Sequence, residues 1–292
     1  MEEYTEHKEL HALISLLDDP DNQIFETIQQ KIYSYGVDAI PLLESAWENA
    51  FDNMIQQRIE SIIHKLQFEN LYKELRIWSR KGQQDLLTGF LLITKHHYPD
   101  LDEEKIREQL HHIRQDIWLK LSDDMTSLEK VKVVNHILFD VYKFSGNKSN
   151  ISAPQNSHIN TVLETKKGNP LSLGIIYIIL ARFLDMPIYG VNLPQHFILA
   201  FMNDSVEGSR QITNDRDVLF YINPFNKGAV FTRREIDLFI KQLKIKPEQS
   251  YYIPCDNRII LKNIINNLIY SYESLGYSDK VRELKMLRNT LK

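Results

Sequence analysis

The feature that most constrains this chain is an apolar run from Leu171 to Leu184, broken only by Ser172 and Arg182. A membrane-spanning helix needs roughly 20 apolar residues, and this run is shorter. The run is typical instead of a helix buried in the core of a globular domain. A loop ends just before it, and Pro170 stands at the first helical position, where helices readily accept proline.

Length and composition indicate a globular protein. The 292 residues suffice for one large or two modest domains, and 43% of them are hydrophobic. The formal net charge of −4 provides no positive field for a phosphate backbone, so we expect no nucleic-acid partner. The N-terminus lacks the basic and apolar regions of a signal peptide, and we expect no membrane association. Cys255 is the single cysteine, so a disulfide within the chain is impossible, which points to a reducing, cytoplasmic location.

The N-terminal segment, which we assign to residues 1–82, has the spacing of packed helices. Apolar residues recur at helical intervals over 10–17 and 24–32, with an Asp-Pro-Asp turn between them. Together with an Ile-Pro-Leu-Leu start after Gly36, this pattern resembles one HEAT-like repeat unit, and residues 58–75 resemble a degenerate second unit. The alternative is an irregular helical bundle, because a solenoid normally needs three or more units.

The remainder of the chain changes from helices to a mixed pattern. We expect helices within 84–122 and 127–144, and a break at 145–150. Beyond this break the predicted helices are 157–164, the apolar run, 232–243, 258–275 and 278–291, and the predicted strands are 188–192, 196–202 and 218–223. The pattern therefore predicts an α+β fold that is predominantly helical.

Three residues have the arrangement of a nucleophilic site. Ser172 lies in the first turn of the apolar helix, where unpaired N–H groups favour a developing oxyanion. His196 begins one predicted strand and Asn223 ends another, so pairing of these strands would bring imidazole and amide together. A nucleophile at a helix tip, a histidine on a strand and an orienting group on the next strand form the papain and transglutaminase arrangement.

At these residues the chain resembles the SirB-type branch of the transglutaminase-like superfamily, over about residues 85–292. The motifs that carry the resemblance are Tyr98-Pro99-Asp100-Leu101-Asp102, Phe144-x-Gly146-Asn147, Asn156-Ser157, Val162-Leu163-Glu164, Gly168-x-Pro170-x-Ser172-Leu173, Gly190-Val191-Asn192-x-Pro194-x-His196-Phe197 and Asn223-Pro224-Phe225-Asn226. The resemblance implies a core at 83–246 in which a central helix packs on an antiparallel sheet. It also implies a tetratricopeptide-like helix pair at 247–292.

The resemblance also assigns the site residues. Active members of the superfamily use a Cys-His-Asp triad, and Ser172, His196 and Asn223 match its three positions. Serine is typical of this branch, whereas the third motif more often carries aspartate. A serine depends on its base far more than a cysteine does, and replacing the aspartate of a Ser-His-Asp enzyme by asparagine costs about 10⁴-fold in turnover.

The reading we favour is a non-catalytic module that binds a peptide or protein. Asn169, Asn192 and Gln195 are expected to line its pocket, although Asn192 and Gln195 alternatively only close a turn. One alternative is a weak serine-dependent amidase, protease or acyl-transferase, and another is a structural scaffold. We expect no metal and no organic cofactor, and the sequence leaves the oligomeric state open.

Overall fold

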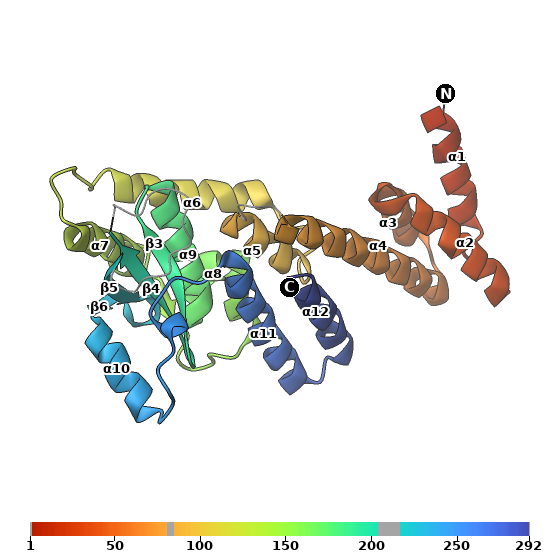
Figure 1. Cartoon of the computed structure of the whole chain (residues 1–292). Helices are drawn as coiled ribbons and strands as arrows, with labels where there is room; N and C mark the ends of the chain where they lie inside the picture. The colour runs from red at the N-terminus through yellow and green to blue at the C-terminus, as the bar shows by residue number, and fades with distance from the viewer. Residues whose placement is uncertain (1, 81–84, 204–216, 292) are drawn as a thin grey trace. The chain divides into compact units, whose positions relative to one another are not determined.

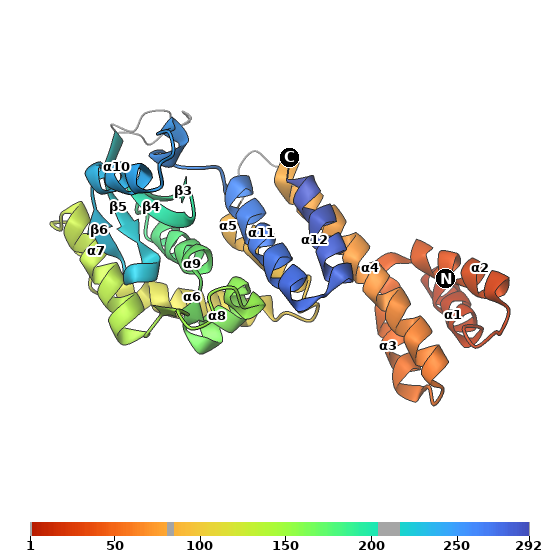
Figure 2. The ribbon, with the colours of Figure 1, turned by 90° about the horizontal axis from the view of Figure 1, so that it is seen from below.

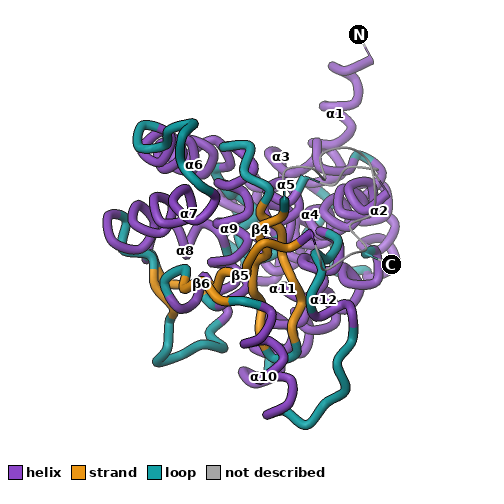
Figure 3. Tube along the Cα trace, turned by 60° about the vertical axis from the view of Figure 1, so that its left-hand side comes forward, coloured by secondary structure: helices purple, strands orange, loops and turns teal. Residues whose placement is uncertain are grey.

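The structure is a computed structural model that describes residues 2–80, 85–203 and 217–291. The chain divides into two compact units, Met1–Glu74 and Leu75–Lys292. Helices predominate among the described residues, and the strands occupy one small region (Figure 3). The predicted α+β, predominantly helical fold is therefore confirmed. Among the helices of the described residues, none combines the length and the apolarity needed to cross a membrane.

The first unit is entirely helical. Its elements are α1 (Glu2–Ser15), α2 (Asn22–Ser34), the 3-10 helix η1 (Gly36–Ala39), α3 (Ile40–Asn49) and the first part of α4 (Asn53–Arg80). Asp21 caps α2 by accepting a hydrogen bond from the N–H of Gln23 at 2.8 Å. Arg58 of α4 donates to the carbonyls of Leu17 and Asp19 at 2.8 and 2.7 Å, which satisfies acceptors beyond the end of α1.

The stretch 58–75 is part of one continuous helix. It lies wholly inside α4, so it does not form the helix pair that a second repeat unit would need. The sequence from Asn53 to Arg80 contains no glycine, proline or turn-forming pair. No residue in this range therefore ends the helix.

The second unit surrounds a small sheet with helices (Figure 1). Its helices are α5 (Leu86–Lys95), α6 (Glu103–Trp118), α7 (Ser127–Asn135), the π-helix η2 (His136–Val141), η3 (Pro154–Ser157), α8 (Ile159–Thr165), α9 (Pro170–Phe183), η6 (Pro224–Asn226), α10 (Arg233–Gln242), η7 (Gln249–Tyr251), α11 (Asn257–Leu275) and α12 (Ser278–Thr290). Its strands are β1 (Ser145–Gly146), β2 (Lys167–Gly168), β3 (Ile188–Leu193), β4 (His196–Met202), β5 (Val218–Asn223) and β6 (Ala229–Phe231). The predicted bounds of β4 and β5 match the structure, whereas β6 and the parallel pair β1–β2 were not predicted.

The main sheet is antiparallel with the order β3-β4-β5-β6, and each of its faces is covered by a different helix. On one face Gly174 of α9 sits so close to Phe197 that an added Cβ would lie 2.7 Å from its ring. On the other face Ile198 and Ala200 pack in one core with Ile236 of α10. Because side chains alternate along a strand, the even-numbered positions of β4 all belong to the α10 face.

The C-terminal helices form an antiparallel pair that packs on the core of this unit. Gly276 ends α11 with a φ of 79°, the left-handed conformation that glycine adopts without strain. Figures 1 and 2 both show α11 alongside α12, and α11 also contacts α5 and α9. Leu261 of α11 reaches Gly89 of α5, where a larger residue would collide with it. This packing places α11 opposite the first turn of α9.

Candidate functional site

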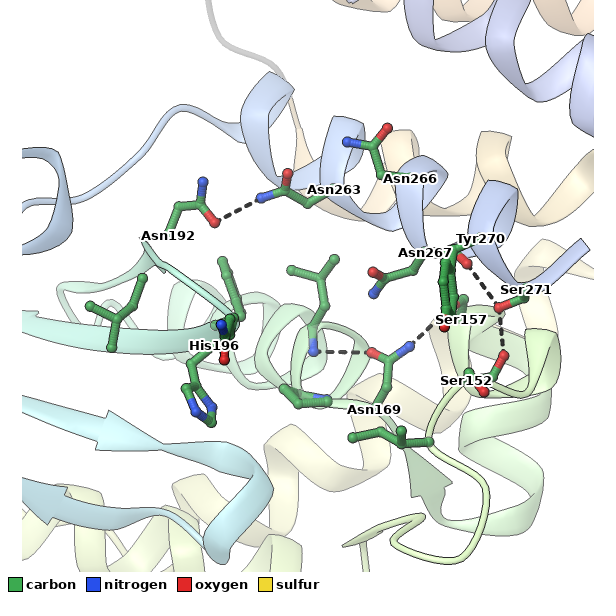
Figure 4. Close-up of a pocket in the computed structure, with 16 residues that line it drawn as sticks. Ser152, Ser157, Asn169, Asn192, His196, Asn263, Asn266, Asn267, Tyr270 and Ser271 are labelled. Carbon is green, nitrogen blue, oxygen red and sulfur yellow. Dashed lines mark hydrogen bonds between the residues drawn. The ribbon is translucent and has the colours of Figure 1, made fainter. Parts of the chain in front are cut away.

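A pocket opens between the first turn of α9, the β3–β4 turn and α11 (Figure 4). Its cavity volume is about 370 Å³, which suits a small ligand or one side chain of a larger one. The residues that line it are Ile151, Ser152, Ser157, Asn169, Pro170, Leu171, Asn192, Leu193, Gln195, His196, Phe197, Asn263, Asn266, Asn267, Tyr270 and Ser271. This lining includes the three residues expected at a pocket from the sequence, Asn169, Asn192 and Gln195. Their functional role stays a prediction.

The first turn of α9 is held by Asn169. This buried residue caps the helix, because its Oδ1 accepts hydrogen bonds from the N–H groups of Leu171 and Ser172 at 3.0 and 2.9 Å. Its Nδ2 donates to Ser157 Oγ at 2.9 Å. The helix-tip N–H groups that would stabilise an oxyanion are thus already bonded to the cap.

Ser172 is fully buried, and its hydroxyl is part of the same cap. Its Oγ accepts from the N–H of Asn169 at 3.1 Å and lies 3.3 Å from the carbonyl of Asn169, to which it donates. The two residues therefore form a reciprocal capping box. Ser172 is absent from the pocket lining, so its oxygen does not face the cavity.

His196 lies on the other face of the sheet from α9. It begins β4 opposite Leu193, and its ring packs edge-on against Phe239 of α10 with the centroids 4.8 Å apart. Figure 4 shows its imidazole directed away from Asn169 and from α11. The residue contributes to the wall of the pocket without turning its ring toward Ser172.

Asn223 ends β5 and caps the following 3-10 helix. Its Oδ1 accepts from the N–H groups of Phe225 and Asn226, both at 3.1 Å. Among the residues that the structure describes, no hydrogen bond joins any two of Ser172, His196 and Asn223. Each of these three residues, which the sequence resemblance assigned to triad positions, has a local structural partner.

The chain's single cysteine does not replace the missing thiol nucleophile. Cys255 is largely buried, and this burial raises the pKa of its thiol to about 12. Its N–H donates to the carbonyl of Gly190 at 2.8 Å, which fixes the segment beside β3. A thiol with so high a pKa carries almost no thiolate at neutral pH.

One wall of the pocket was not predicted, because it comes from α11. Asn263, Asn267 and Tyr270 lie about one helical turn apart on the face of α11 that is not buried. Asn263 Nδ2 donates to Asn192 Oδ1 at 3.0 Å, which joins the helix to β3. The asparagines recur on the face of α11 that its buried apolar residues leave open, and this is the sequence signal that would have identified the wall.

A buried histidine cluster lies directly behind the pocket. His158 follows Ser157 in sequence and is 1% exposed, with its ring stacked on His97 at 5.3 Å and edge-on to Tyr98 at 5.3 Å. Neither ring nitrogen has a hydrogen-bond partner among the described residues. Burial, followed by the nearby His97, His96 and Lys280, lowers the pKa of His158 to about 3.

The cluster connects α12 to the end of α5. Lys280 Nζ donates to His97 Nδ1 at 2.8 Å, and His96 Nε2 lies 3.0 Å from Glu283 Oε2. Burial lowers the pKa of both His97 and Lys280. No group of three or more His, Cys, Asp or Glu residues in the described part of the chain has the arrangement of a metal site.

Comparison with known proteins gives one family and several relatives. The family model described as the transglutaminase-like superfamily matches residues 104–266. A UPF0162 protein of Xylella fastidiosa (strain 9a5c) is 29% identical, covering 74% of this chain and 78% of its own, and one of Vibrio cholerae is 24% identical, covering 61% and 62%. F-box only protein 21 of Mus musculus is 29% identical over 54% of this chain but only 24% of its own. No solved structure matches.

Proposed function

This chain belongs to the transglutaminase-like superfamily, whose family model matches more than half of it, and we propose that it is a non-catalytic member that binds a peptide or protein segment. The observation that carries the proposal is the state of Ser172. Its hydroxyl is buried and bonded within the helix cap, while an open pocket persists beside it. A ligand that enters this pocket therefore meets amides and hydroxyls, and it does not meet the serine.

The chemistry of a serine nucleophile supports the same proposal. A serine hydroxyl attacks only when a base within hydrogen-bond reach takes its proton. His196 packs against α10, and Asn223 lacks the charge that would stabilise an imidazolium. Turning His196 toward α9 would require β4 to shift its register by one residue, which would also remove Phe197 and Leu199 from the α9 face. We therefore do not favour the weak amidase, protease or acyl-transferase.

We also propose a finer assignment of the chain. Membership of the SirB-type branch fits the motifs at 168–173, 190–197 and 223–226, and the paired helices α11 and α12 are compatible with a tetratricopeptide-like tail at 247–292. Helices α1 to α3 are compatible with a single HEAT-like unit within 1–82, followed by the core at 83–246. A cytoplasmic location is supported by the single cysteine.

Covalent labelling tests whether Ser172 reacts. The full chain is treated with a fluorophosphonate, digested and analysed by mass spectrometry beside Ser172→Ala. We expect no adduct at position 172. Specific labelling of Ser172 would overturn the proposal in favour of serine-dependent acyl chemistry.

A cysteine substitution tests whether position 172 is accessible. Ser172→Cys is compared with Ser274→Cys, an exposed position on α11, after treatment with iodoacetamide. We expect rapid alkylation at 274 and almost none at 172. Equal rates would show that the helix tip opens to solvent and that the pocket reaches it.

Binding is tested with a pool of acetylated and amidated octapeptides of mixed composition. The readout is the side-chain NH₂ resonances of Asn192, Gln195 and Asn267 in the ¹⁵N-labelled full chain. We expect these resonances to shift while that of Asn49, in the other unit, stays in place. A pool that shifts none of the pocket amides would refute the proposed binding function.

A further inference from the structure

The pocket wall is built mainly from neutral side chains. None of its lining residues is Asp, Glu, Lys or Arg, whereas six carry carboxamides and three are serines. On this basis, and resting on the binding function proposed above, we propose that the pocket selects an uncharged, extended peptide segment, and that the amide face of α11 recognises its backbone. The amide face is defined here as Asn263, Asn266 and Asn267.

Charge selection follows from the cost of desolvation. A carboxylate or ammonium that leaves water without an opposite charge loses several kcal/mol, which neutral amides only partly restore. Among the described residues, the cation bonded to this wall is Arg288 of α12, which donates to Asn266 Oδ1 at 3.0 Å and does not itself line the cavity. A neutral segment meets no such cost, so the wall discriminates against both signs of charge.

Several polar groups at the pocket still have hydrogen-bonding capacity. In the described part of the chain, the side-chain amides of Gln195 and Asn267 have no hydrogen-bond partner, and Asn263 uses only its Nδ2. Ser157 is 1% exposed and accepts from Asn169, yet its own hydroxyl proton has no acceptor within the described ranges. Carboxamides both donate and accept, which matches the alternating N–H and C=O groups of a peptide backbone.

The spacing of the α11 amides suits an extended chain. Asn263 and Asn267 are separated by one turn, a rise of about 6 Å along the helix. Every second residue of an extended peptide repeats at about 6.6 Å. A strand laid along α11 therefore presents equivalent backbone groups to both asparagines.

Gln195 provides a further amide at the pocket from a strained backbone position. It occupies the two-residue turn between β3 and β4 with a φ of 63°, a left-handed conformation that is strained for a residue with a Cβ. Glycine would adopt this conformation without strain. The exposed glutamine at this position places one more amide at the pocket. The apolar rim, formed by Ile151 and the 65%-exposed Tyr270, leaves room for an uncharged side chain of the ligand.

The test divides the octapeptides into three matched pools: neutral, and identical except for one internal Glu or one internal Lys. Affinities come from titration of the pocket NH₂ resonances in the full chain. We expect each charged pool to bind about tenfold more weakly than the neutral pool, a difference of about 1.4 kcal/mol. Gln195→Gly should weaken neutral-pool binding without reducing stability.

An isosteric variant tests the role of α11 directly. Asn267→Asp adds a charge without changing shape, and it should weaken the neutral and Glu pools while strengthening the Lys pool. Asn49→Asp, an exposed asparagine of the other unit, is the matched control and should change none of the three affinities.

The outcomes separate the inference from the proposed function. Equal binding of all three pools would overturn the charge selection and leave the binding function standing. Shifts caused by N-acetylglucosamine but by no peptide would overturn both the peptide assignment and the proposed function. Unchanged selectivity in Asn267→Asp would show that α11 does not recognise the ligand.

Discussion

Acid should destabilise the Leu75–Lys292 unit through His158, and replacing this histidine should remove the effect. The imidazole is buried between His97 and Tyr98, and its two nitrogens have no partner among the described residues. His97, His96 and Lys280 surround it with cationic or protonatable groups, and Tyr272 packs near His97. A proton on His158 would therefore be both desolvated and repelled.

The size of the effect follows from the pKa difference. The pKa is about 3 in the folded protein and about 6.5 in an unfolded chain. Between these values the unfolded state binds a proton that the folded state does not, so stability falls as the pH falls. From pH 7 to pH 5 the loss is about 2 kcal/mol, because each unit below 6.5 costs about 1.4 kcal/mol. For a unit of this size the melting temperature should fall by about 4–8 °C.

Native-state hydrogen exchange at the buried amides of α9 measures this loss for the second unit alone, once intrinsic rates are corrected for pH. His158→Phe keeps an aromatic ring in the stack and removes the titrating group. The wild-type protein should lose about 2 kcal/mol more than this variant between pH 7 and pH 5. His112→Asn, at an exposed position of α6, is the control and should behave like the wild type. Equal losses in wild type and His158→Phe would refute the reasoning.

Three further substitutions test the packing that positions the pocket. Asn169→Ala should destabilise the second unit by about 1–2 kcal/mol, because it removes the α9 cap; hydrogen exchange of α9 measures this. Gly174→Val should cost about 1–3 kcal/mol by forcing a side chain against Phe197, whereas an unchanged urea midpoint would contradict the close contact. Arg58→Ala should destabilise the first unit by about 2 kcal/mol, because two carbonyls lose a charged donor; exchange of α1 and α2 amides reports it, and exchange in α9 should be unaffected.

Much of the fold was predictable because local patterns determine it. The apolar run could only be a buried helix, and Asn169-Pro170 defined its start. The apolar run over 196–202 indicated the bounds of β4, and the alternation of side chains along a strand placed His196, Ile198 and Ala200 on one face. The pattern does not specify which helix covers that face. Packing between distant segments decides it, since Ile198 and Ala200 share one core with Ile236 of α10, and no local pattern encodes such a contact.

The candidate site shows the same limit. Motif matching identified Ser172, His196 and Asn223, but their hydrogen bonds and ring contacts depend on groups that the motif does not mention. The wall supplied by α11 lies about seventy positions beyond Asn192 in sequence, and its docking depends on long-range packing, as where Leu261 meets Gly89. Residues 58–75 do not form the helix pair of a second repeat unit, because no residue in this range ends a helix.

The adjacency of the histidine cluster and the pocket has a thermodynamic consequence. Ser157 and Ser271 line the pocket, and the next residue after each, His158 and Tyr272, belongs to the buried cluster. Proton uptake at His158 and ligand binding at the pocket therefore both act on residues 157–158 and 271–272. If acid weakens ligand binding by some factor, the bound ligand must lower the proton affinity of His158 by that same factor. Because folded His158 takes up its proton only near its pKa of about 3, such coupling would act well below neutral pH.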